Sequence, residues 1–350
     1  MTADPAAVWR VIHGYTGYWV AVAGVKLGVF DALADGPLDA TDLAGRCGAA
    51  PRPVGVIADG LTAIGLLVRD DSGYALSDAA AAHLVTGCPA SMADLLVWSP
   101  GPEANWPLLD EIARGGRPPA PIEDDAAAFY ERLVDATLPS QIVVARAALG
   151  ALGPGPGSSL LELGAGRAPW ASVLLAGDSA ANAVVNDLPE VLEGTPRALG
   201  ALAARCSFVA GDYLVADIPA GPFDLVVLGH VLRAEPDERA RRLVALAAGR
   251  LSPGGRLVVT EYLGGRDPST HPQPALLAAT MLAATVDGRI CTTDDIEAWL
   301  GAAGCRVVTG PGPVANTDVV VAERAERAEP LERAEPLERA ERLEPGGRGA

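Results

Sequence analysis

Three acidic residues recur at an even spacing in the second half of the chain. Glu162, Asp187 and Asp212 are 25 residues apart, and each follows a short apolar run of the kind that forms a buried strand. In a doubly wound sheet the carboxyl ends of the strands meet at one crevice. A carboxylate there can accept both hydroxyls of a ribose, and Asp212, beside the Tyr213 ring, can accept an adenine amine. The spacing therefore predicts a nucleoside-binding site.

Small residues follow the first of these carboxylates. The segment "ELGAGRAPW" places Gly164 and Gly166 between a strand end and an expected helix start. Glycines let the backbone approach a ligand closely, and a helix N-terminus offers free N–H groups. A dinucleotide-binding loop would have a third glycine where this chain has Pro169, so the loop disfavours NAD. Leu188 and Gly229, each next to a strand end, are expected in the same crevice.

A further set of residues can act on a substrate. In "LGHVLRAEPDERARR", His230 and Arg233 follow an apolar run and are one helical turn apart. A neutral histidine can take a proton, whereas arginine, with a pKa above about 12, can only hold an anion. The proline and acids of "PDERARR" are interpreted as ordinary helix-start residues. The question is whether His230 is a base or Arg233 stands where a base would be.

Composition excludes several classes of function. The net charge is −17, which disfavours nucleic acid as a partner. Five scattered cysteines form no CxxC or Cys/His cluster, so neither a metal site nor a disulfide framework is expected, and a reducing, cytoplasmic setting fits best. The N-terminus lacks the basic segment of a signal peptide, and the apolar stretch 11–25 is too short to span a bilayer.

The first hundred residues predict a winged helix. Helix-periodic apolar residues over 5–34 are followed by a short helix from about residue 39, a longer helix over 51–64 and a hairpin in "LLVRDDSGYALS". DNA binding, including a ligand-sensing regulator, is disfavoured because residues 1–100 carry five basic and ten acidic side chains. The apolar first helix indicates a module for packing or dimerisation.

The rest of the chain predicts an α/β domain. Apolar runs that alternate with helical segments predict strands, and the last two runs are close enough for an antiparallel hairpin: 159–163, 182–186, 207–210, 224–229, 255–262, 305–310 and 317–323. We divide the chain into a winged-helix dimerisation domain, a helical linker that contributes to the substrate pocket, a Rossmann-like catalytic domain and a charged, low-complexity tail expected to be disordered: 1–100, 101–152, 153–322 and 323–350.

Residues 1–322 resemble the S-adenosylmethionine-dependent O-methyltransferases of plant caffeate and bacterial polyketide-tailoring type. The resemblance rests on "ELGAGRA", on "NDLPEVL" as the ribose-binding segment and on "GDYL" as the adenine-binding segment, with Ala168 where a further glycine is usual. It implies a class I methyltransferase sheet with a reversed last strand, S-adenosylmethionine as cofactor, a small-molecule substrate and a homodimer.

The resemblance also places the catalytic base. The family carries a histidine and Asp-Trp-x-Asp-Glu after the fourth strand, and alignment through "PDE" puts Arg233 at the histidine. Glu261 matches the first of two acids that flank that histidine, and Ile290 stands at the second. Two readings remain open: methyl transfer to an acidic oxygen, carbon or nitrogen in natural-product tailoring, or another reaction (hydroxylation, decarboxylation or cyclisation) that retains the cofactor.

Overall fold

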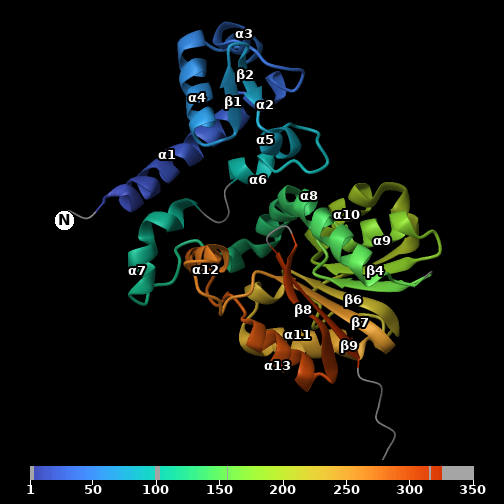
Figure 1. Ribbon diagram of the computed structural model, residues 1–350. Coiled ribbons are helices and arrows are strands. Elements are labelled where there is room, and N and C mark those ends of the chain that lie inside the picture. The colour runs from blue at the N-terminus through green and yellow to red at the C-terminus, as the bar shows by residue number, and fades with distance from the viewer. Residues whose placement is uncertain (1–3, 99–102, 156, 315–316, 325–350) are drawn as a thin grey trace, which may run out of the picture.

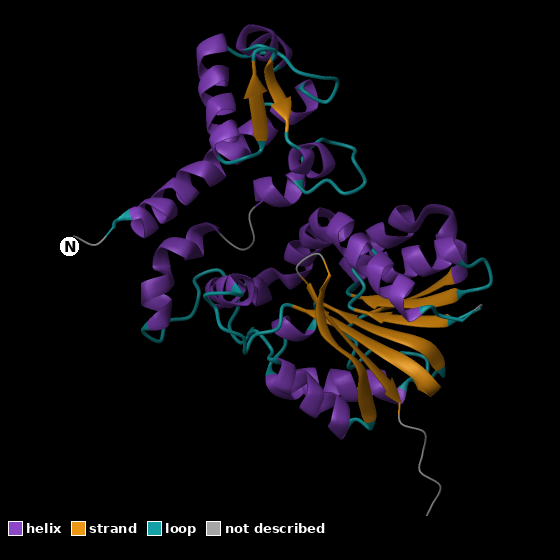
Figure 2. Cartoon of the chain, viewed as in Figure 1, coloured by secondary structure: helices purple, strands orange, loops and turns teal. Residues whose placement is uncertain are grey.

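The protein is described from a computed structural model, which covers residues 4–98, 103–155, 157–314 and 317–324. Figures 1 and 2 show a small N-terminal domain beside a larger α/β domain, joined by a run of helices. No helix within the described ranges is long and apolar enough to cross a membrane.

The N-terminal domain is the predicted winged helix, formed by four helices, a hairpin and two further short helices: α1 (Ala6–Lys26), α2 (Val29–Ala32), α3 (Ala40–Arg46), α4 (Pro51–Ala63), β1 (Leu67–Asp70), β2 (Gly73–Leu76), α5 (Asp78–His83) and α6 (Ala93–Trp98). Asp39 caps α3 by accepting the N–H groups of Thr41 and Asp42 at 2.8 and 2.9 Å. A Cβ on Gly73 would lie 2.3 Å from the Leu38 carbonyl oxygen, so only glycine lets the hairpin pack this closely.

Helix α1 packs only in part against its own domain. Its C-terminal half contacts α4 and α2, whereas its N-terminal half extends away from the domain in Figure 1. Large apolar side chains are exposed along it, namely those of Val8, Trp9, Val11, Ile12, Tyr15 and Trp19. Such a surface on a helix is typical of a protein–protein contact.

Helical segments connect the two domains: η1 (Glu103–Leu108), α7 (Leu109–Ala113), η2 (Ile122–Asp125) and the 27-residue α8 (Ala126–Leu152). The buried Asn105 holds this region to the α/β domain, because its amide donates to the carbonyls of Ala120 and Ala283 at 3.0 and 2.8 Å. Helix α8 ends at Leu152 and the first strand of the large sheet begins at Ser159, which agrees with a division of the chain after residue 152.

The α/β domain contains a seven-stranded sheet in the order β5-β4-β3-β6-β7-β9-β8. Its elements are β3 (Ser159–Leu163), α9 (Pro169–Gly177), β4 (Asn182–Asp187), α10 (Pro189–Leu199), η3 (Gly200–Arg205), β5 (Cys206–Ala210), β6 (Phe223–Gly229), η4 (Leu232–Ala234), α11 (Asp237–Gly249), β7 (Leu251–Glu261), α12 (Pro272–Ala284), α13 (Thr293–Ala302), β8 (Cys305–Val314) and β9 (Thr317–Arg324). β3 to β7 are parallel, and β9 is antiparallel to β7, which confirms the predicted reversed last strand.

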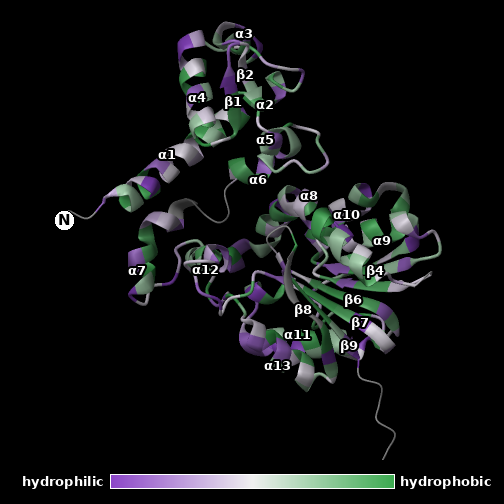
Figure 3. Ribbon diagram, in the orientation of Figure 1, coloured by the Kyte–Doolittle hydropathy of each residue, from purple (hydrophilic) through white to green (hydrophobic). Residues whose placement is uncertain are grey.

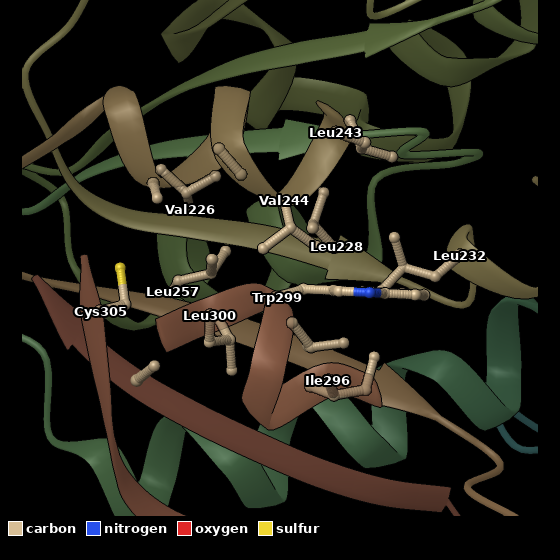
Figure 4. Close-up of a cluster of buried hydrophobic side chains, with 14 of the residues drawn as sticks. Val226, Leu228, Leu232, Leu243, Val244, Leu257, Ile296, Trp299, Leu300 and Cys305 are labelled. Carbon is tan, nitrogen blue, oxygen red and sulfur yellow. The ribbon is translucent and has the colours of Figure 1, made fainter. Parts of the chain in front are cut away.

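Helices cover both faces of this sheet, as Figures 1 and 2 show. α8 and α9 pack with one face, and α11 and α13 pack with the other (Figure 4). The central strands are apolar along almost their whole length (Figure 3), as expected for parallel strands buried on both faces. This burial holds the strand ends, and hence the loops that follow them, in fixed positions.

The topology creates one crevice at the carboxyl edge of the sheet. The chain runs outward from β3 to β4 and β5, then returns to place β6 and β7 on the other side of β3. Ligands bind where the strand order reverses in this way. The structure differs slightly at the C-terminus, because Glu323 and Arg324 belong to β9 and not to the predicted tail. Residues 325–350 of that tail lie outside the described residues.

Candidate active site

A cavity of about 400 Å³ lies at the carboxyl edge of the sheet. Its walls come from α8, from the β3–α9 loop, from the residues after β4, β5 and β6, and from α12. Ten of the eleven residues expected at the site line it: Glu162, Gly164, Gly166, Asp187, Leu188, Asp212, Tyr213, Gly229, His230 and Arg233. The sequence-based reasoning thus brought together residues that are up to 71 positions apart in the chain.

The glycine loop is fixed by close contacts. Gly164 and Gly166 have φ values of 62° and 57°, in the left-handed region that favours glycine. A Cβ on Gly164 would lie 2.4 Å from Cγ1 of Val231, and one on Gly166 would lie 2.8 Å from Cγ1 of Val134. Ala168 also has a positive φ, 55°, which explains why a glycine is usual at this position.

The carboxylate of Glu162 caps the helix that follows this loop. It accepts the N–H groups of Trp170 and Ala171, at 3.2 and 2.9 Å, in the first turn of α9. Burial raises the pKa of Glu162 to about 8, although these two N–H groups act in the opposite direction. Glu162 therefore orders the loop from behind, and only its outer surface contributes to the cavity.

Asp187 ties the end of β4 to the glycine loop. One carboxylate oxygen accepts the Gly166 N–H and the other accepts the Leu188 N–H, each at 2.7 Å. Burial raises the pKa of Asp187, while the same two N–H groups lower it. Each carboxylate oxygen has a second lone pair, so the group can still accept the hydroxyls of a ribose.

Asp212 and Tyr213 belong to a network of charged groups that the sequence analysis did not predict. Asp212 accepts a hydrogen bond from Arg239 at 2.8 Å, and Arg239 also donates to Glu235. The Tyr213 hydroxyl donates to the other oxygen of Glu235. The PDERARR segment therefore does more than start α11, because Arg239 lines the cavity and fixes both Asp212 and Glu235.

Arg233 and Glu261 form a buried ion pair. Nη1 of Arg233 lies 3.2 Å from Oε2 of Glu261, whose other oxygen accepts the N–H groups of Leu232 and Arg233 at 2.9 and 3.3 Å. Burial alone would raise the pKa of Glu261, but the Arg233 charge and nearby His230 hold it below its usual range. Glu261 is only 2% exposed and lies behind Arg233, not in the cavity wall.

His230 lines the cavity, but neither of its ring nitrogens is exposed. Both ring nitrogens are buried, and no group in the described ranges hydrogen-bonds either of them. Nδ1 lies 3.7 Å from Oε2 of Glu261, and the ring packs against Tyr262 with a centroid distance of 5.0 Å. Burial lowers the pKa of His230, so the ring is neutral at pH 7.

His271 and Ile290 do not line the cavity. His271 precedes α12 and its Nδ1 contacts the neighbouring Thr270 hydroxyl at 3.0 Å, outside the cavity wall. Ile290 packs near Gly264, and within the described ranges no second carboxylate forms an ion pair with Arg233. The adjacent Arg289 instead donates its backbone N–H to the Arg233 carbonyl at 2.9 Å, which helps to hold that turn.

The linker 101–152 was predicted to contribute to the substrate pocket, but the individual residues of the helical walls were not identified from the sequence. Tyr130, Val134 and Gln141 line the cavity from α8, and Leu277 and Met281 line it from α12. The spacing 130, 134, 137 and 141 follows one face of α8, but an amphipathic helix gives no sign of which site it covers. Arg167 links this wall to the glycine loop by an ion pair with Asp135, at 2.5 and 3.1 Å.

The cavity fits S-adenosylmethionine, the cofactor implied by the sequence. The glycine loop leaves room that a Cβ would fill, and the carboxylates of Asp187 and Asp212 suit a ribose and an adenine amine. More carboxylates than guanidinium groups line the walls, which favours a positively charged sulfonium. In the described ranges, no group of three or more histidine, cysteine or acidic side chains is placed to hold a metal ion.

The first prediction concerns Gly164. Gly164→Ala should weaken binding of S-adenosylhomocysteine, the demethylated cofactor, by about tenfold or more, because the methyl group needs both a strained φ and displacement of Val231. Titration calorimetry measures this. Gly177→Ala, where a Cβ in the same segment meets nothing, is the matched control. Equal affinities in the two variants would contradict the close packing.

The second prediction concerns the pH dependence of stability. An unfolded histidine takes up a proton near pH 6.5, whereas the pKa of His230 in the folded state is lower. The unfolded state therefore binds more protons as the pH falls below about 6.5, and folded His230 destabilises the protein there. His230→Phe should gain stability relative to the wild type between pH 7.5 and 5.5, measured by urea unfolding. If the difference in unfolding free energy between the variant and the wild type is the same at pH 7.5 and 5.5, this prediction is wrong.

Comparison with known proteins agrees with this geometry. Residues 121–306 match the model of the O-methyltransferase domain, and residues 9–86 match that of the O-methyltransferase dimerisation domain. The chain is 29% identical over 331 residues to the 3-hydroxy-5-methyl-1-naphthoate 3-O-methyltransferase of Streptomyces sahachiroi, covering 86% of this chain and 91% of that protein.

Solved structures share the fold. A putative O-methyltransferase from Nostoc punctiforme superposes with a TM-score of 0.81 at 22% identity, covering 92% of this chain and all of that one. Human N-acetylserotonin methyltransferase in complex with S-adenosylmethionine gives a TM-score of 0.77 at 23% identity, covering 93% of this chain and 99% of that one. The chain therefore belongs to the O-methyltransferase family and is an S-adenosylmethionine-dependent methyltransferase that acts on a small molecule.

Proposed function

We propose that this enzyme methylates an ionisable hydroxyl group of an aromatic small molecule without a histidine general base. The Arg233–Glu261 pair carries the proposal, because Arg233 lines the cavity and the family resemblance places it where a histidine base is usual. Arginine cannot accept a proton at neutral pH, but its charge lowers the pKa of a phenol placed beside it.

The cofactor residues are assigned by position. When bound, S-adenosylmethionine supplies a methyl group on a positively charged sulfur, which an acceptor lone pair can displace in line. We assign the ribose to Asp187, with Leu188 beside it, and the adenine to Asp212 and Tyr213. The glycine loop with Glu162 behind it, and Gly229 at the end of β6, complete the site.

The protonation states of the neighbouring side chains support a reaction without a base. Glu261 holds its charge, but it lies behind Arg233 and cannot reach an acceptor in the cavity. His230 is neutral, yet both its ring nitrogens are buried. We therefore assign Glu261 as the residue that positions Arg233, and His230 as part of the cavity wall.

The acceptor is assigned from the cavity wall and from the relatives. Apolar side chains of α8 and α12, among them Phe129, Leu277 and Met281, line the cavity that Arg233 also lines. The Streptomyces sahachiroi relative is named for methylating a hydroxyl on a naphthoate, which is a flat aromatic acid. Both observations support an aromatic hydroxyl as the acceptor and a role in natural-product tailoring.

Two further assignments concern organisation. The division into 1–100, 101–152, 153–322 and a tail is supported by the ends of α6 and α8 and by the start of β3. The dimerisation-domain match and the exposed apolar face of α1 support a homodimer.

A second candidate function is a reaction other than methylation, with the cofactor retained. Arg233 at the base position is the observation that favours it, since a methyltransferase that needed a base would lose activity. The two candidates differ in the fate of the cofactor. Methyl transfer forms one S-adenosylhomocysteine per product molecule, whereas the alternative forms none.

The third prediction tests the role of Arg233. Arg233→Ala should lower turnover of a hydroxynaphthoate acceptor by about 100-fold, the typical loss when one donor to a catalytic anion is removed. Arg233→Lys should be intermediate, because lysine keeps the charge but loses the planar fork. S-adenosylhomocysteine formation, followed by mass spectrometry, measures both variants.

Two control variants sharpen this test. Arg241→Ala, on the exposed side of α11, should leave turnover unchanged. His230→Phe should retain turnover within about threefold, whereas removal of a general base costs 10²–10⁴-fold. A loss in His230→Phe as large as that in Arg233→Ala would refute the reaction without a base.

The fourth prediction concerns the dimer. Replacement of Trp9, Val11 and Tyr15 by serine should convert a dimer into a monomer at micromolar concentration, because it removes the exposed apolar face of α1. Light scattering after size-exclusion chromatography measures this. Val56→Ser, at an exposed apolar position on α4, is the control and should stay dimeric. A dimeric triple variant would assign the interface to another surface.

A further inference from the structure

One hydroxyl group in the cavity wall has no hydrogen-bond partner among the residues that the structure describes. The hydroxyls of Thr137, Thr280 and Thr285 donate to carbonyls of their own helices, and that of Tyr213 donates to Glu235. Tyr130 also lines the cavity, but nothing in the described ranges hydrogen-bonds its hydroxyl. This donor is therefore available to a ligand.

Tyr130 lines the same cavity as the glycine loop and Arg233. It is one helical turn before Val134, whose side chain lies against Gly166 of the glycine loop. Of the charged groups near its hydroxyl, Arg233 affects its pKa most, ahead of Glu123, Glu235 and Asp187. Tyr130 and Arg233 therefore line the same cavity, Tyr130 from α8 and Arg233 from η4.

The hydroxyl is a donor and not a base. Burial raises the pKa of Tyr130 to about 12, although the Arg233 charge lowers it. At neutral pH the group keeps its proton. A neutral phenol in this place can donate a hydrogen bond to an acceptor oxygen, and it cannot remove a proton from one.

Two nitrogens of the Arg233 side chain are available to donate hydrogen bonds to a ligand. Its Nη1 is bound to Glu261, and its Nε and Nη2 form no hydrogen bond within the described part of the chain. Arg233 and Tyr130 come from different elements, η4 and α8, and the neighbouring wall of Phe129, Leu277 and Met281 is apolar. A ligand in this part of the cavity therefore meets two polar donors against an apolar background.

We propose that Tyr130 and Arg233 form a two-point clamp that selects aromatic acceptors with two neighbouring oxygens. Arg233 holds one oxygen and the Tyr130 hydroxyl donates to the other. The proposal rests on the proposed function in one respect, that the acceptor lies beside Arg233. It adds a specificity-determining residue and a class of acceptor, such as a catechol-like diol or a hydroxyl next to a carbonyl or carboxylate.

Discrimination follows from the cost of an unpaired donor. An acceptor with a single oxygen displaces water from both donors but satisfies only one of them. A buried polar group left unpaired costs about 1–3 kcal/mol, so a site built for two oxygens rejects a one-oxygen analogue. Removal of the Tyr130 hydroxyl should abolish that penalty along with the preference.

The experiment compares two ligands that differ by one oxygen. Full-length enzyme saturated with S-adenosylhomocysteine is titrated with 2,3-dihydroxynaphthalene and with 2-naphthol, by calorimetry. The wild type should bind the diol about tenfold more tightly. Tyr130→Phe should bind the two equally, because its affinity for 2-naphthol rises by about tenfold once the unpaired hydroxyl is removed. Tyr74→Phe, which removes a buried hydroxyl bonded to Asp59 in the N-terminal domain, should behave as the wild type.

Each other outcome overturns the clamp. If Tyr130→Phe keeps the tenfold preference, another group reads the second oxygen. If Tyr130→Phe binds both ligands more weakly by the same factor, the Tyr130 side chain has only a structural role. If the wild type binds S-adenosylhomocysteine but shows no preference for the diol, the two-oxygen acceptor class is wrong. The proposed methyl transfer is judged separately, by S-adenosylhomocysteine formation and its dependence on Arg233.

Discussion

The buried ion pair between Glu261 and Arg233 is the constraint on which the acceptor side depends. Glu261 ends β7 in the core of the sheet, and its carboxylate receives two backbone N–H groups and a guanidinium from the turn after β6. A buried carboxylate without these partners would be very costly, so the turn is held in one conformation. Arg233 consequently presents its remaining N–H groups to the cavity.

The ion pair also limits the positive charge that Arg233 adds to the cavity. An arginine alone next to a sulfonium would repel it, but Glu261 cancels most of that effect at short range. The guanidinium can then hold an acceptor anion without driving out the cofactor. The network of Arg239 with Asp212 and Glu235 leaves a net negative charge on the cofactor side, which favours the sulfonium.

The fold and the gathering of the three carboxylates at one edge of the sheet were largely predictable from the sequence. Glu162, Asp187 and Asp212 follow apolar strands, and parallel strands bring their carboxyl ends to one edge, so spacing along the chain became proximity in space. Helices were expected to form the pocket walls, but individual wall residues such as Tyr130 were not predictable in this way, because a helix outside the sheet can cover several sites. Glu261 was expected to face the acceptor, but its place in the sheet core turns it toward the backbone of residues 232–233.

The most direct test of the account is the ionisation of a phenol bound beside Arg233. The absorbance of 2-naphthol reports its ionisation, and it can be followed against pH in the complex with S-adenosylhomocysteine. Naphthol bound beside Arg233 should ionise at a lower pH than the free compound, because a guanidinium stabilises the anion. Ionisation at the same or a higher pH would contradict it, since the enzyme would then need a base that Arg233 cannot supply.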